Sequence, residues 1–246
     1  MRAAYPVIVS AAQRSAFAAA ASSMSFGRLG GGSNTTQYVL AVNGVSLHLR
    51  HGQRLGLMGR NGSGKSTLLR LMAGIVQPSA GERRVVGSVG CVLGGFGLDS
   101  DKTGLQNMKL IARLHGLNGP ALKGAVDDAI EFCELGPYLE LPVRTYSSGM
   151  LGRLSYAMAT ANQADIVLID EGIGAGDNKF IDKAVRRAKQ ICSHSGISVV
   201  ASHSDHILRG FSDIGLWIDA GEVKAIGPID DVIATYTKFL QSIGEI

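Results

Sequence analysis

The residues whose types and spacing most clearly indicate a chemical role lie between Gly59 and Thr67, where the chain reads Gly-Arg-Asn-Gly-Ser-Gly-Lys-Ser-Thr. An apolar run ends at Gly59 and a helix-forming run begins near Lys65, so the pattern G-x-x-x-x-G-K-[ST] occurs in a strand–loop–helix context. Three glycines allow the backbone to wrap with its N–H groups facing inward, as a nest for an anion. The following helix adds the positive end of its dipole. We therefore expect this loop to cradle the phosphates of a nucleotide.

Two side chains of the loop have distinct expected roles. Lys65 should reach the β- and γ-phosphates, and Ser66 should place its hydroxyl on Mg²⁺. The expected nucleotide-binding set also includes the other residues of the loop, which are Gly59, Arg60, Asn61, Gly62, Ser63, Gly64 and Thr67. The alternative is a Gly/Ser-rich turn that merely precedes an ordinary helix, and the complete pattern in this context argues against it.

Two acids follow an apolar run later in the chain. Residues Ile166–Ile169 precede Asp170 and Glu171, and a buried strand that ends there delivers a carboxylate at the edge of a sheet, beside the phosphate loop. We expect Asp170 to hold Mg²⁺ through water and Glu171 to orient or deprotonate an attacking water. The alternative is a simple Asp-Glu turn after a strand.

A histidine and a second helix start complete the set. His203 follows the strand-like run at 197–201, where its ring can contact the γ-phosphate, whereas the other five histidines are assigned structural roles. The second helix start reads Tyr-Ser-Ser-Gly-Met and comprises Tyr146, Ser147, Ser148, Gly149 and Met150. Either serine can cap this helix. Because a helix N-terminus attracts anions, the same turn is also a second candidate phosphate site.

The elements that must position these residues alternate between strands and helices. Strands are expected at 5–9 (an edge strand with Pro6), 39–49, 55–58, 84–93, 165–170 and 197–201, with a hairpin at 214–218 and 222–226, and a loop at 27–36. Helices are expected at 66–74, 180–192 and 229–243, the first burying Leu68, Leu69, Leu71, Met72 and Ile75. The sequence thus predicts one three-layer α/β domain over 1–246, with a core at 1–100 and 163–246. A helical subdomain at 101–162 is inserted in it.

Composition supports a globular protein and restricts its partners. Apolar residues make up 46% and charged residues 18%, which allows a substantial core. The net charge of +4 is uneven, since no acid precedes Glu82. A basic N-terminal third can meet nucleotide phosphates, an anionic membrane surface or nucleic acid, and the lack of interleaved aromatics makes nucleic acid the weakest of these. Three cysteines without close spacing predict neither disulfides nor a zinc site and favour a reducing compartment.

Two negative observations concern membranes and targeting. No apolar stretch approaches the roughly 18–20 residues of a membrane span. The Ala/Ser-rich segment at 11–24 is interpreted as a poorly ordered or short helical insertion rather than a cleaved targeting peptide.

The order of these motifs resembles the ATP-binding cassette (ABC) ATPases over almost the whole chain: phosphate loop, Ser-Ser-Gly helix start, apolar-Asp-Glu strand and Ser-His exit. Most cassettes read Leu-Ser-Gly-Gly-Gln at the helix start. Tyr-Ser-Ser-Gly-Met, together with the segments 102–107 (Lys-Thr-Gly-Leu-Gln-Asn) and 174–177 (Gly-Ala-Gly-Asp), is similar to the polysaccharide-export branch, which serves O-antigen, capsule and teichoic acid transporters.

The resemblance implies a RecA-like P-loop NTPase core with an antiparallel β edge and a helical signature subdomain, using ATP and Mg²⁺. It further implies a head-to-tail homodimer in which each ATP lies between the phosphate loop of one copy and the Ser148-Gly149 helix end of the other, with Ser147 and Met150 in the same nucleotide-binding set. Asp177 would act across that interface. Hydrolysis would drive integral membrane permease subunits, with this chain peripheral on the cytoplasmic face of the inner membrane and without a nucleic-acid partner.

This sequence departs from the usual cassette pattern in three respects. Leu93-Gly94-Gly95 stands where cassettes usually carry a Gln that coordinates water or metal. The aromatic residue that stacks on adenine is Phe17, Tyr38 or Tyr5, and each is as readily a core residue. No C-terminal glycan-binding domain is expected after the last helix.

The alternative functions are a cassette for another substrate, such as a drug, lipid or metal complex, and a soluble nucleic-acid or ribosome-associated cassette.

Overall fold

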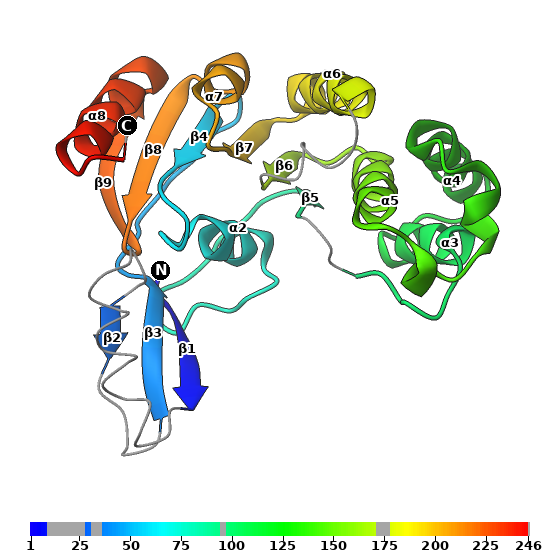
Figure 1. Cartoon of the computed structure of the whole chain (residues 1–246), viewed down its shortest axis with the longest axis horizontal. Helices are drawn as coiled ribbons and strands as arrows, with labels where there is room; N and C mark the ends of the chain where they lie inside the picture. The colour runs from blue at the N-terminus through cyan, green and yellow to red at the C-terminus, as the bar shows by residue number, and fades with distance from the viewer. Residues whose placement is uncertain (9–27, 31–35, 94–96, 171–177, 246) are drawn as a thin grey trace. The chain divides into compact units, whose positions relative to one another are not determined.

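The computed structural model describes residues 1–8, 28–30, 36–93, 97–170 and 178–245 of the chain. These residues form two compact units (Figure 1). The first unit comprises Met1–Val86 with Ile197–Ile246, and the second comprises Gly87–Gly196. Each unit has its own core and contributes different members of the predicted site.

A sheet of mainly parallel strands forms the centre of the first unit. Its strands are β4 (Arg54–Met58), β7 (Ile197–Ala201), β8 (Ile214–Asp219) and β9 (Glu222–Pro228). β4 lies between β7 and β8 and is parallel to both, whereas β9 is antiparallel to β8. This arrangement contains the predicted antiparallel edge, and the β8–β9 hairpin lies where the sequence predicts it. The central strand β4 leads directly into the phosphate loop.

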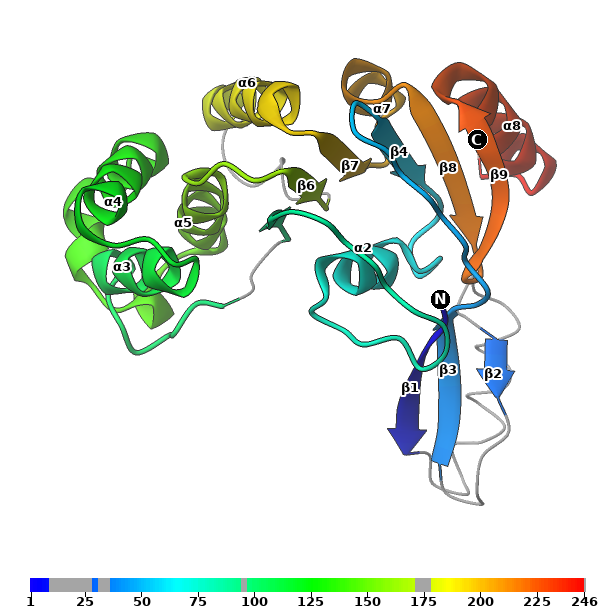
Figure 2. The same ribbon diagram turned by 180° about the vertical axis from the view of Figure 1, so that it is seen from behind.

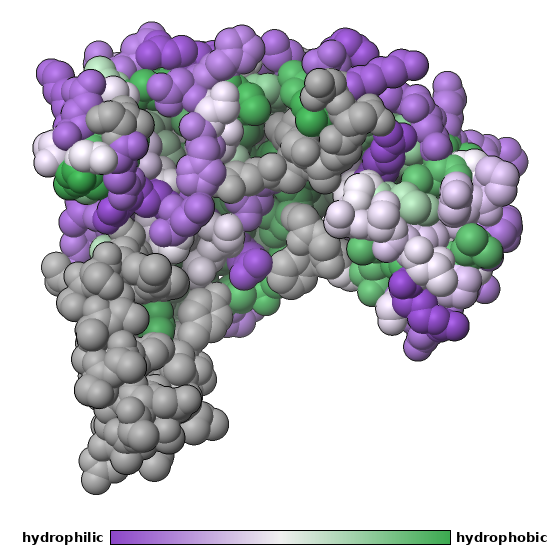
Figure 3. All heavy atoms as spheres, viewed as in Figure 1, coloured by the Kyte–Doolittle hydropathy of each residue, from purple (hydrophilic) through white to green (hydrophobic). Residues whose placement is uncertain are grey.

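Three helices pack on this sheet, as Figures 1 and 2 show. They are α2 (Lys65–Ala73), α7 (Asp205–Phe211) and α8 (Ile229–Ser242). α7 packs on β4 and β7, and α8 packs on β8 and β9. Gly56 in β4 permits this close approach, because a Cβ there would lie 3.0 Å from Ile229 Cδ1. Hydrophilic residues dominate the surface over α7 and α8 (Figure 3).

The burial of α2 follows the predicted stripe with one exception. Leu68, Leu69 and Leu71 are fully buried, but Ile75 is 51% exposed. The prediction for Ile75 is wrong because α2 ends before it. Gly74 takes a left-handed conformation with φ 79°, which turns the chain out of the helix.

A separate three-stranded antiparallel sheet belongs to the same unit (Figure 2). It contains β1 (Ala3–Ile8), β2 (Arg28–Gly30) and β3 (Thr36–Val42), in the order β1-β3-β2. β1 is an edge strand, as predicted. Two predictions here are wrong: residues 28–30 form a strand in a segment interpreted as a loop, and β3 ends at Val42 instead of continuing to Leu49. The chain turns at Gly44, whose φ is 68°.

The second unit combines a pair of parallel strands with helices. The strands are β5 (Val89–Val92) and β6 (Ile166–Ile169), and β5 is shorter than the predicted strand at 84–93. The helices are α3 (Gly104–Leu114), α4 (Gly119–Cys133), α5 (Ser148–Thr160) and α6 (Asn178–His194), with short 3₁₀ turns η2 (Gly136–Glu140) and η3 (Val143–Thr145). The segment 101–162 is thus helical, as its composition indicates.

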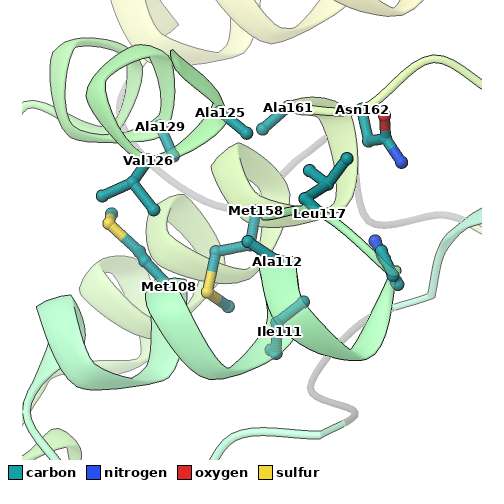
Figure 4. Close-up of a pocket in the computed structure, with 11 residues that line it drawn as sticks. Met108, Ile111, Ala112, Leu117, Ala125, Val126, Ala129, Met158, Ala161 and Asn162 are labelled. Atoms are coloured by element: carbon teal, nitrogen blue, oxygen red, sulfur yellow. The ribbon is translucent and has the colours of Figure 1, made fainter. Parts of the chain in front are cut away.

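Aromatic and other apolar side chains hold these helices together. Phe132 of α4 lies 5.8 Å from the Tyr156 ring of α5 and 5.5 Å from the Phe180 ring of α6, measured between ring centroids. On the α3 side, Met108, Val126 and Met158 border a cavity of about 10 Å³ (Figure 4). Such a cavity holds at most one water. α3, α4 and α5 are therefore closely packed.

The segment Lys-Thr-Gly-Leu-Gln-Asn has a structural explanation. Thr103 caps α3 by accepting from the Gln106 N–H at 3.1 Å, and Gln106 Oε1 accepts from the Thr103 N–H at 2.9 Å. Asn107 is fully buried, and its amide accepts from the Asp99 N–H and donates to the carbonyls of Asp99 and Thr103. These bonds fix the loop before α3.

Gly104→Ala should destabilise the second unit. A Cβ at Gly104 would lie 2.4 Å from Tyr146 Oη, whose hydroxyl donates to the Tyr138 carbonyl at 2.6 Å. We expect the free energy of unfolding to fall by about 1–3 kcal/mol, measured by thermal or urea unfolding. The matched control is Gly124→Ala in α4, where a Cβ meets nothing within 4 Å. It should raise stability by about 0.5–1 kcal/mol, and an equal loss in both variants would contradict the steric explanation.

Candidate functional site

The loop between β4 and α2 is held in a conformation that requires glycine. Gly59, Gly62 and Gly64 have φ values of 151°, 77° and 108°. A Cβ at Gly59 would lie 2.2 Å from the Ile218 carbonyl oxygen, and one at Gly64 would lie 2.3 Å from the Ala41 carbonyl oxygen. Backbone conformation and neighbouring strands thus both exclude side chains at Gly59 and Gly64. The loop can wrap tightly because nothing projects from these positions.

A positive charge lies inside this loop. Lys65 is 5% exposed, and its ammonium donates to the carbonyls of Gly59 at 2.6 Å and Arg60 at 3.2 Å. Helix α2 begins at the same residue, and no side chain in the described part of the chain caps its N-terminus. The ammonium and the positive end of the helix dipole therefore act at one point, which favours binding of phosphate.

Hydroxyl groups flank the ammonium in sequence. Ser66 and Thr67 are half-buried in the first turn of α2. Ser63 is 1% exposed, and within the described ranges its hydroxyl has no hydrogen-bond partner. Buried hydroxyls normally have a partner, so this group is suited to a polar ligand. The residues present in the loop therefore fit a polyphosphate, and Ser66 supplies an oxygen of the kind that Mg²⁺ prefers.

The structure brings His203 to the phosphate loop. β4 and β7 are parallel, with Leu57 opposite Ala201, so both strands end at the same edge of the sheet. His203 Nε2 lies 2.9 Å from Asn61 Oδ1, although 142 residues separate them in sequence. The catalytic role of His203 remains a prediction, and its ring is near the loop as that role requires.

The second unit contributes two predicted groups. Asp170 follows β6 and is half-buried, and its N–H donates to the Val92 carbonyl at 3.0 Å. Ser147 caps α5 by accepting from the Met150 N–H at 3.2 Å, which leaves Ser148 exposed at the first position of the helix. Both predicted positions thus lie at the end of a regular element.

Gly149 differs from the glycines of the phosphate loop. A Cβ there would meet only Ser147 Oγ, at 3.9 Å, and its φ is not left-handed. Nothing within 4 Å in the described part of the chain therefore requires glycine at this position. A ligand or partner surface that approaches the backbone closely would require it.

Several predicted residues lie outside the described residues: Glu171, Asp177, Gly94, Gly95 and Phe17. Tyr5 and Tyr38 lie in β1 and β3, where the structure describes the backbone. Among the described residues, no group of three or more His, Cys, Asp or Glu side chains could hold a metal. No described helix has the length and apolar character needed to cross a membrane.

Sequence reasoning missed the partners of Arg60. Its Nη1 donates to Glu245 Oε1 at 2.8 Å, and its Nε lies 3.6 Å from Asp219 Oδ1. No sequence pattern connects these residues, because Glu245 is 185 positions away. The contact arises from the packing of α8 against β8.

Known proteins share both sequence and fold with this chain. Residues 42–174 match the family described as ABC transporter. The teichoic acids export ATP-binding protein TagH of Lactococcus lactis is 34% identical over 213 residues, which is 87% of this chain and 46% of that protein. The O-antigen export system ATP-binding protein RfbE of Yersinia enterocolitica is 44% identical over 184 residues, covering 74% of this chain and 77% of that protein. The chain spans about half the length of the first curated relatives, both TagH proteins.

Solved structures share the fold. The dimeric, post-hydrolysis ATP-binding cassette MJ0796 bound to ADP and Pi aligns with a TM-score of 0.68 at 22% identity, covering 83% of this chain and 97% of that one. Another dimeric structure of MJ0796 aligns equally well, at 23% identity. At this identity the likeness establishes the fold alone, and it confirms the predicted α/β cassette.

Proposed function

This chain belongs to the ABC transporter family, and on that premise we propose that it is the ATP-hydrolysing subunit of an exporter that moves a polysaccharide across the inner membrane. The observation that carries the proposal is the phosphate loop, with its excluded side chains at Gly59 and Gly64 and its buried Lys65 ammonium. The polysaccharide class is supported by the names of the relatives, which export teichoic acids and O-antigen. Similarity to RfbE, which covers most of both chains, favours this class over drug or lipid substrates.

Within this proposal the residues of the loop bind and orient ATP. The Lys65 ammonium has three N–H donors: it keeps its bond to the Arg60 carbonyl, gives up its bond to the Gly59 carbonyl and donates to the β- and γ-phosphates. Ser66 and Asp170 would hold Mg²⁺, which would neutralise charge on the phosphates. The Ser63 hydroxyl, which has no partner among the described residues, would form a hydrogen bond to the same ligand.

Two further residues act on the γ-phosphate and the attacking water. Glu171 accepts the proton of the water. His203 contacts the γ-phosphate from its place beside Asn61, where Nε2 and Oδ1 are 2.9 Å apart. The Asn61 amide thereby orients the ring toward the loop.

A second copy of the chain completes each site. Ser147, Ser148, Gly149 and Met150 of that copy offer a helix N-terminus to the γ-phosphate, and Asp177 acts across the interface. The open surroundings of Gly149 support this arrangement, because a Cβ there would obstruct an approaching ligand and not the chain itself. The assembled homodimer is peripheral on the cytoplasmic face of the inner membrane.

The permease subunits dock, in this proposal, on the surface that follows residues 94–96. The loop 97–102 is tied to the segment that leads to Ser147, since the N–H groups of Val143 and Arg144 donate to the carbonyls of Lys102 and Ser100, each at 2.9 Å. Arg144 also pairs with Asp101 at 2.7 Å. Displacement of this loop by a permease would therefore be transmitted to the start of α5.

Deletion of the gene tests the proposal directly. The mutant should lose surface polysaccharide, detected by staining or lectin binding, and should accumulate lipid-linked glycan inside the cell. Complementation with the wild-type gene is the positive control, and complementation with the Lys65→Ala variant should fail. Normal surface glycan in the deletion strain would overturn polysaccharide export, and the ATPase activity of the purified chain would then be tested with other exported substrates.

A further inference from the structure

The C-terminal helix α8 is firmly attached to the strand that borders the phosphate loop. Val232 and Ile233 of α8 share a buried cluster with Trp217 of β8. The Trp217 ring centroid lies 4.9 Å from that of Phe239 and 5.6 Å from that of Tyr236. Such aromatic contacts stabilise the packing beyond the area they bury. The last turns of α8 therefore have a fixed position relative to the end of β8.

Arg60 extends from the phosphate loop to the end of α8 and to Glu245 just after it, whose N–H donates to the Leu240 carbonyl of α8 at 3.0 Å. Its guanidinium bonds to Glu245 at 2.8 Å, lies 3.6 Å from Asp219, and lies 5.6 Å from the Phe239 ring centroid. The side chain is 27% exposed, so these contacts are partly shielded from solvent. The hydrogen bond to Glu245 raises the pKa of Arg60 above its ordinary value. Three contacts from two different segments thus restrain a single side chain of the loop.

The backbone of the same residue holds the catalytic lysine. The Arg60 carbonyl accepts from Lys65 Nζ at 3.2 Å and from the Ser63 N–H at 3.2 Å. Because the side chain and the carbonyl belong to one residue, anchoring the guanidinium limits the backbone conformations of Arg60, and with them the positions that its carbonyl can take. The end of α8 is therefore mechanically connected to the ammonium that binds phosphate.

We propose that Arg60 is a positioning residue through which the end of α8, by way of Glu245, sets the place of Lys65 in the phosphate loop. The inference rests on the proposed binding of ATP at this loop. Without the pair, the loop has more conformational freedom, and ordering it on binding reduces affinity. The coupling gives α8 influence over nucleotide affinity without contact between α8 and the nucleotide.

Titration of the purified full chain with a fluorescent ATP analogue and Mg²⁺ tests this coupling. Glu245→Gln removes the charge and keeps the shape of the side chain, and it should weaken analogue binding about two- to fivefold, the range of a partly exposed ion pair. The KM for ATP should rise by a similar factor while kcat changes less than the KM. The matched control is Asp230→Asn, which breaks the ion pair of α8 with Arg209 without touching Arg60 and should leave affinity unchanged.

A double-mutant cycle distinguishes coupling from general damage to α8. In the Arg60→Met background, Glu245→Gln should have no further effect on the Kd for the analogue. Independent, multiplicative effects of the two substitutions would overturn the proposal, and so would an unchanged Kd in Glu245→Gln or an equal loss in Asp230→Asn. Absence of analogue binding in the wild-type chain would instead overturn the proposed function, so the two failures are distinguishable.

Discussion

Lys65→Ala should lower ATP turnover by about 10²–10³-fold, the usual loss when one preorganised charge-stabilising group is removed. The reason is the position of the ammonium, which is 5% exposed and enclosed by the loop at the start of α2. In the proposed function this ammonium meets the phosphates where it is shielded from solvent, and a charge has a larger effect there than in bulk water. Phosphate release by the purified chain, at saturating ATP and Mg²⁺, measures the loss.

Two comparisons separate chemistry from folding in this experiment. Lys65→Met keeps most of the buried stem and should lose turnover to the same extent as Lys65→Ala, with a smaller change in thermal stability. Lys224→Ala removes a lysine of β9 that is 37% exposed and pairs with Glu222, and it should retain wild-type turnover. ATP turnover above a tenth of the wild-type rate in both Lys65 variants would show that Lys65 does not stabilise the phosphate charge during hydrolysis.

Glu171→Gln should bind ATP as the wild-type chain does and reduce hydrolysis by about 10²–10⁴-fold, the contribution of a general base. The amide retains the shape of the side chain but cannot accept the proton of the attacking water. Because bound ATP then persists between two copies, the variant should accumulate as a dimer. Size-exclusion chromatography with ATP and Mg²⁺ detects that dimer, and omission of the nucleotide should restore the monomer.

The control for this substitution is Glu131→Gln in α4, which makes the same chemical change at an exposed position. It should hydrolyse ATP normally and give no ATP-dependent dimer. Near-normal phosphate release by the Glu171→Gln variant would exclude this carboxylate as the base. If the Glu171→Gln variant binds ATP tightly without hydrolysing it but stays monomeric, Glu171 keeps its role as the base. That result would contradict the proposal that ATP binds between two copies of the chain.

Local patterns predicted the parts of the fold that local chemistry determines. The boundaries of β7 are those expected from its apolar run, and α2 begins within one residue of its prediction, because the glycines of the loop leave few other conformations. Helix α7 was not predicted, since seven residues give too short a periodicity to recognise. The strand at 28–30 was missed because it depends on pairing with β3 and has no strand-like composition.

Candidate site residues could be named from the sequence, whereas most of their contacts could not. Motif spacing indicated Lys65, Ser66 and His203 as candidates, and their roles stay predictions; the bond between His203 and Asn61 depends on parallel pairing of two strands far apart in sequence. The partners of Arg60 are further examples, since an Arg and a Glu separated by 185 residues leave no pattern. Tertiary packing, and not propensity, decides such pairs.

Residues 59–67 owe their shape to two neighbouring segments as much as to their own glycines. The Ala41 and Ile218 carbonyls occupy the space that side chains on Gly64 and Gly59 would need, and Gly221 donates its N–H to the Ser63 carbonyl at 2.9 Å. A peptide of this sequence, or a graft of it into a foreign protein, would lack these walls and would not retain the same curvature. A graft intended to carry the loop's proposed phosphate binding into another protein must therefore include the ends of β3 and β8 as well.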